Sequence, residues 1–156
     1  SIIKANDKNL NAAAKLFDLY RQFYEERPDL TLARNFLQER IQEKSSVIYL
    51  AVDSDKRAIG FMQLYPLFCS VAATPIWILY DLYVEPSVRR QGVGKLLMNQ
   101  ARKLAKSNGA SRIDLETAGD TTNAQALYES LGYEKEVEFF KYSLLRILVV
   151  IFINFF

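Results

Sequence analysis

Apolar side chains recur at intervals of three and four residues in the first forty positions, which is the spacing of one helix face. The residues that share the first such face are Leu16, Leu19, Tyr20, Phe23 and Tyr24. A second face is made by Ala33, Phe36, Leu37 and Ile41. Pro28 lies between the two sets and ends or starts a helix, and Asp29 or Thr31 can cap the second one. The pattern predicts two amphipathic helices joined at "RPDLT", after a short first strand in "SIIKA".

Three runs of mostly apolar residues follow, each short enough to be a buried strand. They are Val47–Val52, Ile59–Phe68 and Ile76–Val84. The polar turn "DSDKRA" joins the first two runs, which predicts a hairpin. Pro66 has no backbone N–H group and therefore predicts a bend or a sheet edge within the second strand.

Helical spacing returns at Val93–Ser107, and Asn108-Gly109 is a typical helix end. "RIDLET" predicts a further strand, "TTNAQALYESLG" a short helix, and "VEFFKYSL" a last strand. The resulting order is β-α-α-β-β-β-α-β-α-β. It predicts an α+β (α/β) domain over residues 1–145 with one mixed central sheet. That sheet is antiparallel in its first half and parallel where a helix crosses over.

The composition limits which catalytic and metal-binding groups this chain can contain. The chain has 156 residues with one cysteine and no histidine. A Cys/His zinc site, a Ser-His-Asp triad and a disulfide within the chain are therefore excluded, and no metal is expected. A general base must be Asp, Glu, Tyr, a main-chain group or water. The lack of an internal disulfide and of a secretory pattern in "SIIKANDKNL" favours the cytoplasm.

The basic residues are unevenly placed. The net charge of +2 is too small to indicate nucleic-acid binding. Between Glu85 and Asp114, however, the chain carries no acid and a set of basic residues: Arg89, Arg90, Lys95, Arg102, Lys103, Lys106 and Arg112. This run predicts either a solvated helix face or an anion site whose charge extends from the loop along the following helix.

The loop "VRRQGVGKLL" combines glycines and cations just before the helix at Val93. A Walker loop would need glycine where Arg89 stands and Ser or Thr where Leu96 stands. A dinucleotide fingerprint would need a third glycine where Leu97 stands. The remaining interpretation is a diphosphate site held mainly by backbone N–H groups at a helix start. The alternative is a tight strand-to-helix turn that needs glycines only for its geometry.

Two segments resemble one known family. "DLYVEPSVRRQGVGKLL" resembles the central motif of the GNAT superfamily, the acetyl-coenzyme A-dependent N-acetyltransferases, with Arg89, Gly92 and Gly94 at the motif positions. "TTNAQALYESLGY" is similar to the family's asparagine-to-tyrosine helix, with Asn123 and Tyr128. The resemblance covers about Ile2 to Leu145. It implies the GNAT fold, a mixed central sheet with helices on both faces, and acetyl-coenzyme A as the acetyl donor.

The resemblance also assigns donor-binding residues. It implies that the coenzyme A pyrophosphate is bound by a run of loop residues: Arg89, Arg90, Gln91, Gly92, Val93, Gly94 and Lys95. It implies that the preceding strand is interrupted by a bulge, and that the pantetheine arm pairs with its splayed backbone at Leu82, Tyr83 and Val84. One of these N–H groups would face the oxyanion, and Asn123 would contact the donor.

The expected reaction is direct transfer of an acetyl group to a primary amine in a ternary complex. The amine must first lose a proton. Candidate bases are Asp81 and Glu116, or water relayed through carbonyl groups. The resemblance makes Tyr128 the acid that protonates the leaving thiolate and a donor contact, although its apolar helix stripe alone would predict a core residue. A covalent route through Cys69 lacks a partner base.

The acceptor is a small molecule or a peptide. The resemblance places it over the loop "YEERPDLT", where Glu25, Glu26 and Asp29 would favour a cation. Tyr24, Tyr65, Tyr80 and Tyr83 can form an aromatic wall. A small amine, an amino acid or peptide N-terminus, and an aminoglycoside all fit these residues. The alternative is that the acids serve only to solvate helix ends.

An apolar segment ends the chain, and other functions compete with transfer. Leu144–Phe156 is too short to span a bilayer, so no membrane span is expected. The extension over residues 146–156 favours a homodimer contact or an added strand. A non-catalytic acyl-coenzyme A-binding domain is the main functional alternative. A nucleic-acid partner rests only on the basic run and is not expected.

Overall fold

The structure is a computed structural model that describes residues 1–145 of the chain. The chain divides into two compact units, Ser1–Ala118 and Gly119–Phe156. From Arg146 onward, the apolar segment and the dimer contact predicted for it lie outside the described residues. The single domain expected over residues 1–145 and the extension after it stay predictions.

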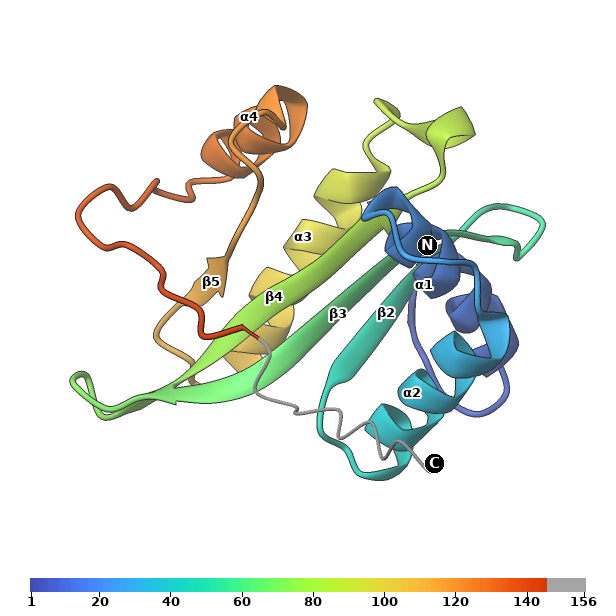
Figure 1. Cartoon of the computed structure of the whole chain (residues 1–156), viewed down its shortest axis with the longest axis horizontal. Helices are drawn as coiled ribbons and strands as arrows, with labels where there is room; N and C mark the ends of the chain where they lie inside the picture. The colour runs from blue at the N-terminus through green and yellow to red at the C-terminus, as the bar shows by residue number, and fades with distance from the viewer. Residues whose placement is uncertain (146–156) are drawn as a thin grey trace, which may run out of the picture. The chain divides into compact units, whose positions relative to one another are not determined.

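The first unit contains one mixed sheet (Figure 1). Its spatial order follows the chain: β1 (Ile2–Lys4), β2 (Val47–Val52), β3 (Ala58–Cys69), β4 (Thr74–Val84) and β5 (Ile113–Leu115). The pairings from β1 to β4 are antiparallel, and β5 runs parallel to β4. The sequence-based prediction of a mixed sheet with one parallel pair is confirmed.

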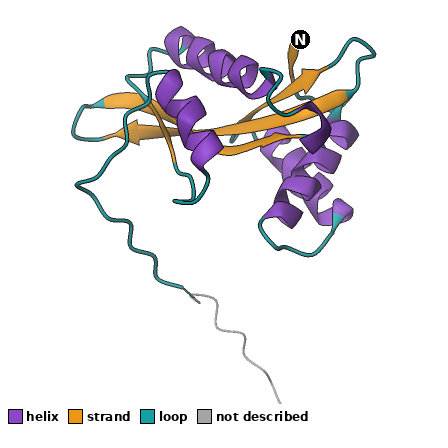
Figure 2. Ribbon diagram, turned by 90° about the horizontal axis from the view of Figure 1, so that it is seen from above, coloured by secondary structure: helices purple, strands orange, loops and turns teal. Residues whose placement is uncertain are grey.

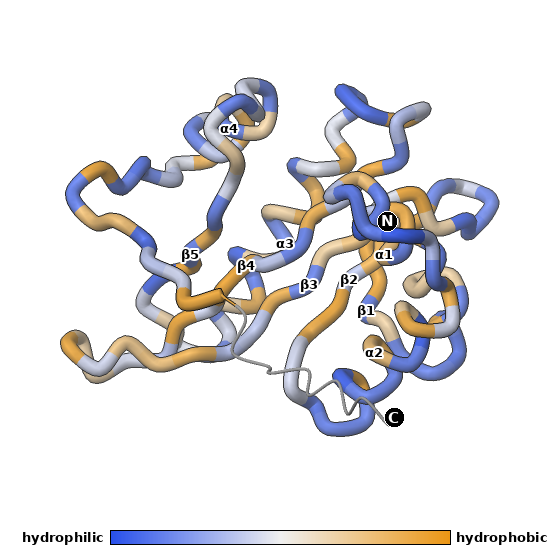
Figure 3. Tube along the Cα trace, in the orientation of Figure 1, coloured by the Kyte–Doolittle hydropathy of each residue, from blue (hydrophilic) through white to orange (hydrophobic). Residues whose placement is uncertain are grey.

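Helices cover both faces of this sheet. Helices α1 (Leu10–Phe23) and α2 (Leu30–Gln42) lie on one face, and α3 (Val93–Ser107) lies on the other (Figure 2). Ile48, Leu50 and Val52 alternate along β2 and join the core under α1 and α2. Their neighbours in β2 are also buried, because α3 covers the opposite face. β2 is accordingly mostly apolar along its length, and a polar turn joins it to β3 (Figure 3).

The distance at which α3 packs against the sheet depends on a glycine in β3. A Cβ atom added at Gly60 would lie 3.1 Å from Val93 Cγ1, 3.2 Å from Leu97 Cδ1 and 3.3 Å from Ala51 Cβ. Only hydrogen fits there without displacing a neighbour. Gly60 therefore fixes how closely the first two turns of α3 approach the sheet, and with them the loop that precedes the helix.

Strand β4 contains the bulge, but at a different place from the one expected. Gln63 pairs with Asp81 and the next residue, Leu64, pairs with Leu79, so Tyr80 is an extra residue with no partner in β3. Leu82–Val84, where the irregularity was predicted, pair with β3 in regular register. The prediction of a bulge in this strand is therefore confirmed, and its position is corrected by two residues.

The second unit contains helix α4 (Thr122–Ser130), with Thr121 at its N-cap and Gly132 at a φ of 89° just past its end. The last predicted strand, "VEFFKYSL", is wrong, because none of the described strands pairs with residues 137–144. A strand is held by ladder hydrogen bonds to a neighbour. Here the N–H group of Glu138 instead donates to the side chain of Glu136, at 2.7 Å. The described elements thus follow the predicted order as far as α4.

Candidate active site

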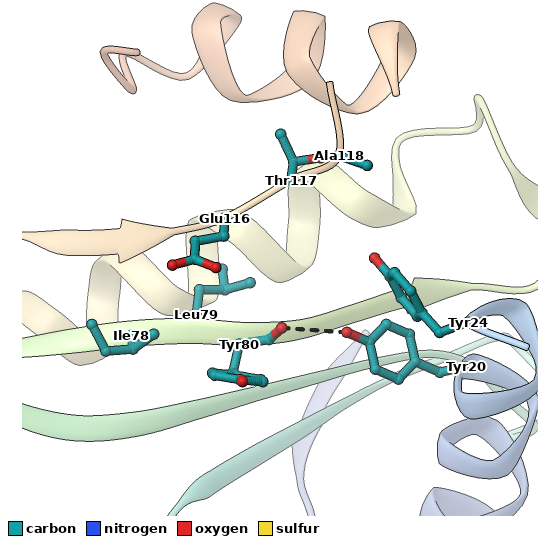
Figure 4. Close-up of a pocket in the computed structure, with 8 residues that line it drawn as sticks. All are labelled: Tyr20, Tyr24, Ile78, Leu79, Tyr80, Glu116, Thr117 and Ala118. Atoms are coloured by element: carbon teal, nitrogen blue, oxygen red, sulfur yellow. Dashed lines mark hydrogen bonds between the residues drawn. The ribbon is translucent and has the colours of Figure 1, made fainter. Parts of the chain in front are cut away.

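A cavity opens where β4 and β5 stop pairing. Their last parallel pair is Leu79 with Leu115, one residue before the bulge. Beyond it, the edge of β4 that faced β5 has no partner strand among the described residues. The cavity has a volume of about 360 Å³ and is lined by Tyr20, Tyr24, Ile78, Leu79, Tyr80, Glu116, Thr117 and Ala118 (Figure 4).

Tyr20 connects helix α1 to the bulge. Its hydroxyl donates a hydrogen bond to the backbone carbonyl of Tyr80, at 3.4 Å (Figure 4). A bulge residue is left out of the strand ladder, so its carbonyl needs another partner. The Tyr20 ring also meets the Tyr24 ring edge-on, with centroids 5.1 Å apart. The α1 end of the cavity is therefore built from two mutually packed phenols.

A chain of buried polar groups lies beneath this wall. Ser46 Oγ donates to Gln63 Oε1 at 2.8 Å, and Gln63 Nε2 donates to Asp81 Oδ2 at 2.7 Å. Asp81 is only 5% exposed. Burial raises the pKa of Asp81, while hydrogen bonds from Gln63 and Tyr20 partly oppose this effect. The pKa of Tyr20 is also raised, first by burial and then by the charge of Asp81.

The loop between α1 and α2 is held from below by a buried carboxylate. Asp18 accepts hydrogen bonds from Arg21 Nη1 at 3.0 Å, Gln22 Nε2 at 3.1 Å and the Asp29 N–H at 3.0 Å. Asp29 in turn caps α2 by accepting from the N–H of Leu32. Asp29 therefore has a structural role.

The two glutamates of this loop differ from each other. Glu26 lies 3.9 Å from Arg21. Glu25 has a φ of 65°, so the chain turns sharply at this residue. Both side chains are exposed, and neither lines the cavity.

The loop before α3 has the backbone geometry of an anion-binding site. Gly92 is the N-cap of α3 with a φ of 84°, and Arg90 also has a positive φ, of 62°. A Cβ at Gly92 would meet nothing within 4 Å, so the approach to the backbone is open. The first N–H groups of a helix have no partner within it and carry the positive end of the helix dipole. The residues present therefore fit a diphosphate.

Arg89 is engaged with the end of β4. Its Nε donates to the carbonyl of Val84 at 2.9 Å, and its guanidinium lies 5.7 Å from the centroid of the Tyr83 ring. Arg89 therefore ties the loop to the strand. Arg90 and Lys95 are exposed on the same loop and first helical turn.

Comparison with known proteins gives the family. The sequence model of the Acetyltransferase (GNAT) family matches residues 13–133. The chain is 40% identical over 144 residues to the uncharacterized N-acetyltransferase YhfO of Bacillus subtilis, an alignment that covers 92% of this chain and 96% of that protein. The chain belongs to the GNAT family of acetyltransferases. It is an N-acetyltransferase by its homologues and its fold.

Other proteins similar to this acetyltransferase are also named as acetyltransferases. The crystal structure of a probable acetyltransferase superposes with a TM-score of 0.87 at 39% identity, covering 92% of this chain and 96% of that one. An aminoglycoside N(6')-acetyltransferase type 1 of Acinetobacter haemolyticus is 32% identical over 102 residues, which covers 64% of this chain and 70% of that protein.

The fold brings some of the predicted site residues together and leaves others apart. Tyr24, Tyr80 and Glu116 line one cavity, whereas Asp81 is buried behind Tyr20. Sequence reasoning missed Tyr20 and Thr117. Tyr20 carried a usable signal, because it stands four residues before Tyr24 on the same helix face. Cys69 lies at the far end of β3, where its Sγ accepts a hydrogen bond from Arg112 at 3.4 Å.

Two predicted residues belong to the second unit. Asn123 and Tyr128 are both in α4, and the Tyr128 ring lies 6.3 Å from the ring of Tyr133. Their assignment to the donor and to acid catalysis stays a prediction. Among residues 1–145, no group of three or more acidic, cysteine or histidine side chains is placed to hold a metal. Over the same residues, no helix is long and apolar enough to cross a membrane.

Proposed function

We propose that this acetyltransferase moves the acetyl group of acetyl-coenzyme A directly onto a primary amine within a ternary complex. The observation that carries the proposal is the divergence of β4 from β5 after Leu79 and Leu115. This divergence leaves one edge of β4 without a strand partner and opens a cavity beside it, with the carboxylate of Glu116 in its lining.

The donor is assigned to two neighbouring segments of the first unit. The N–H groups at Gly92–Lys95 would hold the pyrophosphate, with Arg90 and Lys95 adding charge. The free edge of Leu82–Val84 would accept the pantetheine amides as an added strand accepts a neighbour. Arg89 supports both segments because it bonds the carbonyl of Val84. The donor supplies an acetyl group activated as a thioester.

The reaction balances with groups of this chain. The amine nitrogen forms a bond to the acetyl carbon while the bond from carbon to sulfur breaks. The proton lost by the amine passes to Glu116, directly or through water, because Glu116 lines the cavity. The thiolate takes its proton from Tyr128 in this scheme. Main-chain N–H groups of Leu82–Val84 stabilise the oxyanion.

Asp81 has a different role from Glu116 in this proposal. Its carboxylate is buried and hydrogen-bonded to Gln63, so an amine in the cavity does not reach it. It acts through Tyr20, whose hydroxyl holds the carbonyl of the bulge. Asp81 is therefore a positioning residue that fixes the shape of the strand.

The test is release of free coenzyme A thiol from acetyl-coenzyme A in the presence of a panel of primary amines. We expect release that depends on the amine and a product that carries one added acetyl group on nitrogen. Binding of acetyl-coenzyme A without release on any amine would contradict the proposal and would favour an acyl-coenzyme A-binding role.

A further inference from the structure

A second hollow adjoins the cavity on the side of α2. It has a volume of about 470 Å³ and is lined by Phe36, Tyr65, Pro66, Leu67, Ile78 and Tyr80. We name this hollow the apolar groove. Ile78 and Tyr80 line both the groove and the cavity, so the two form one continuous surface.

The walls of the apolar groove are held in place by neighbouring groups. The Tyr65 and Tyr80 rings meet at 90°, with centroids 5.6 Å apart. Phe36 stacks on Phe17 at 5.6 Å, and Arg40 lies 5.1 Å from the centroid of the Phe36 ring. These contacts fix the rings of the groove before anything binds.

The groove also leaves large apolar side chains open to solvent. Tyr80 is 65% exposed and Leu67 is 51% exposed. Exposed apolar surface that is clustered, and not scattered singly, is typical of a binding surface. Burial also raises the pKa of the Tyr65 hydroxyl to about 12, so this side chain of the groove is uncharged at neutral pH.

The two ends of this continuous surface differ in charge. The cavity has the carboxylate of Glu116 in its lining, whereas no charged side chain of the described residues lines the groove. Arg40, beside the groove, is paired with Glu39 at 3.2 Å and Glu43 at 3.5 Å. An ammonium group placed in the groove would lose water and gain no carboxylate partner from its lining, which is costly.

We infer that the acceptor is a monoamine that carries an aromatic or branched aliphatic body, with the amine in the cavity at Glu116 and the body in the apolar groove. The inference rests on the proposed function and narrows its acceptor. It disfavours polycations such as aminoglycosides, whose several ammonium groups would have to lie against Tyr65, Leu67 and Tyr80.

The first experiment compares primary amines that differ in the body attached to the nitrogen. Ethylamine, isoamylamine, phenethylamine and the aminoglycoside kanamycin are each assayed for thiol release with saturating acetyl-coenzyme A. Burial of the apolar body predicts that kcat/KM for phenethylamine exceeds that for ethylamine by about tenfold to a hundredfold, mainly through KM. We expect kanamycin to be poorer than phenethylamine.

The second experiment locates the binding of the body with two neighbouring substitutions. Leu67→Ala removes part of the groove and should lower kcat/KM for phenethylamine about threefold to tenfold while leaving ethylamine unchanged. Phe68→Ala is the control. Phe68 is the next residue in β3 and therefore points to the opposite face, and it does not line the groove. It should change neither amine.

The outcomes distinguish the inference from the function on which it rests. Equal kcat/KM for ethylamine and phenethylamine, or a preference for kanamycin, would overturn the inference while transfer to amines stands. The same loss in Leu67→Ala for both amines, or in Phe68→Ala, would place the body elsewhere. Absence of thiol release with every amine tested would overturn both.

Discussion

The close approach of α3 to the sheet gives a sharp test of how the donor loop is positioned. In Gly60→Ala, the new Cβ would lie 3.1–3.3 Å from three side-chain carbon atoms, of Val93, Leu97 and Ala51. These distances are too short for relaxed contacts, and Leu97 and Ala51 are fully or almost fully buried. The first turn of α3 is therefore expected to move outward by a few tenths of an ångström.

Two effects on stability oppose each other in this variant. Overpacking of a core costs about 1–3 kcal/mol. Replacing a strand glycine by alanine recovers about 0.5–1 kcal/mol of chain entropy. The net loss is about 0–2.5 kcal/mol, which lowers Tm by up to about 10 °C for a chain of this size. Thermal unfolding followed by circular dichroism measures this shift.

The displacement should also reach the donor, because Val93 begins the helix whose N–H groups are assigned to the pyrophosphate. Misalignment that removes about 1.4 kcal/mol of these hydrogen bonds raises KM for acetyl-coenzyme A about tenfold. Gly119→Ala is the matched control, because a Cβ there meets nothing within 4 Å. It should leave Tm and KM unchanged.

The reasoning can be refuted in two ways. An unchanged Tm and KM in Gly60→Ala would mean that Gly60 does not set the distance between α3 and the sheet. A fall in Tm with an unchanged KM would separate the packing from the donor loop. The double variant Gly60→Ala with Val93→Ala offers a further check, because it removes the Val93 Cγ1 atom from the shortest contact. Its loss of stability should be smaller than the sum of the two single losses.

Three further predictions concern the ionisable groups. Burial raises the pKa of Asp81 in the folded protein, so this residue lowers stability as pH rises from its ordinary pKa through the raised one. Denaturation at pH 4 and pH 7 should therefore show the stability of Asp81→Asn increasing relative to wild type at the higher pH, and the opposite trend would contradict the shift. Glu116→Gln should lower kcat about 10²- to 10⁴-fold, with partial recovery as the pH is raised toward the pKa of the amine, near 10.4, because a growing fraction of the amine is then neutral; a loss that persists at every pH would argue against proton acceptance. Tyr128→Phe should lower turnover while acetyl-coenzyme A still binds in calorimetry, and unchanged turnover would leave Tyr128 a packing residue.

The parts of the fold that were predictable are those set by local pattern. Val47–Val52 is apolar throughout because helices cover both faces of its sheet, and this run predicted a buried strand without further information. The start of α3 was also predictable, since the glycines of "VRRQGVGKLL" mark a place where the chain needs a positive φ.

What could not be predicted depends on pairing between distant segments. The position of the bulge is a matter of register between β3 and β4, and no property of Tyr80 alone reveals it. The buried bond between Gln63 and Asp81 follows from that register. The alternating pattern of "VEFFKYSL" predicted a strand that has no pairing partner among the described strands, because alternation reports a preference and not a neighbour.

The bulge at Tyr80 is a place where the length of β4 can change by one residue without disturbing the pairing of the sheet. Residues paired across strands share a face, so Leu79 lies on the α3 face with Leu64, and Asp81 lies on the opposite face with Gln63. In an uninterrupted strand these two residues would point the same way. Deleting Tyr80 would therefore restore regular alternation, with Leu79 still opposite Leu64 and Asp81 still opposite Gln63. The sheet would stay paired, but the carbonyl that Tyr20 holds and a ring that lines the cavity would be lost. Homologues without the bulge should accordingly keep the sheet and differ at the cavity.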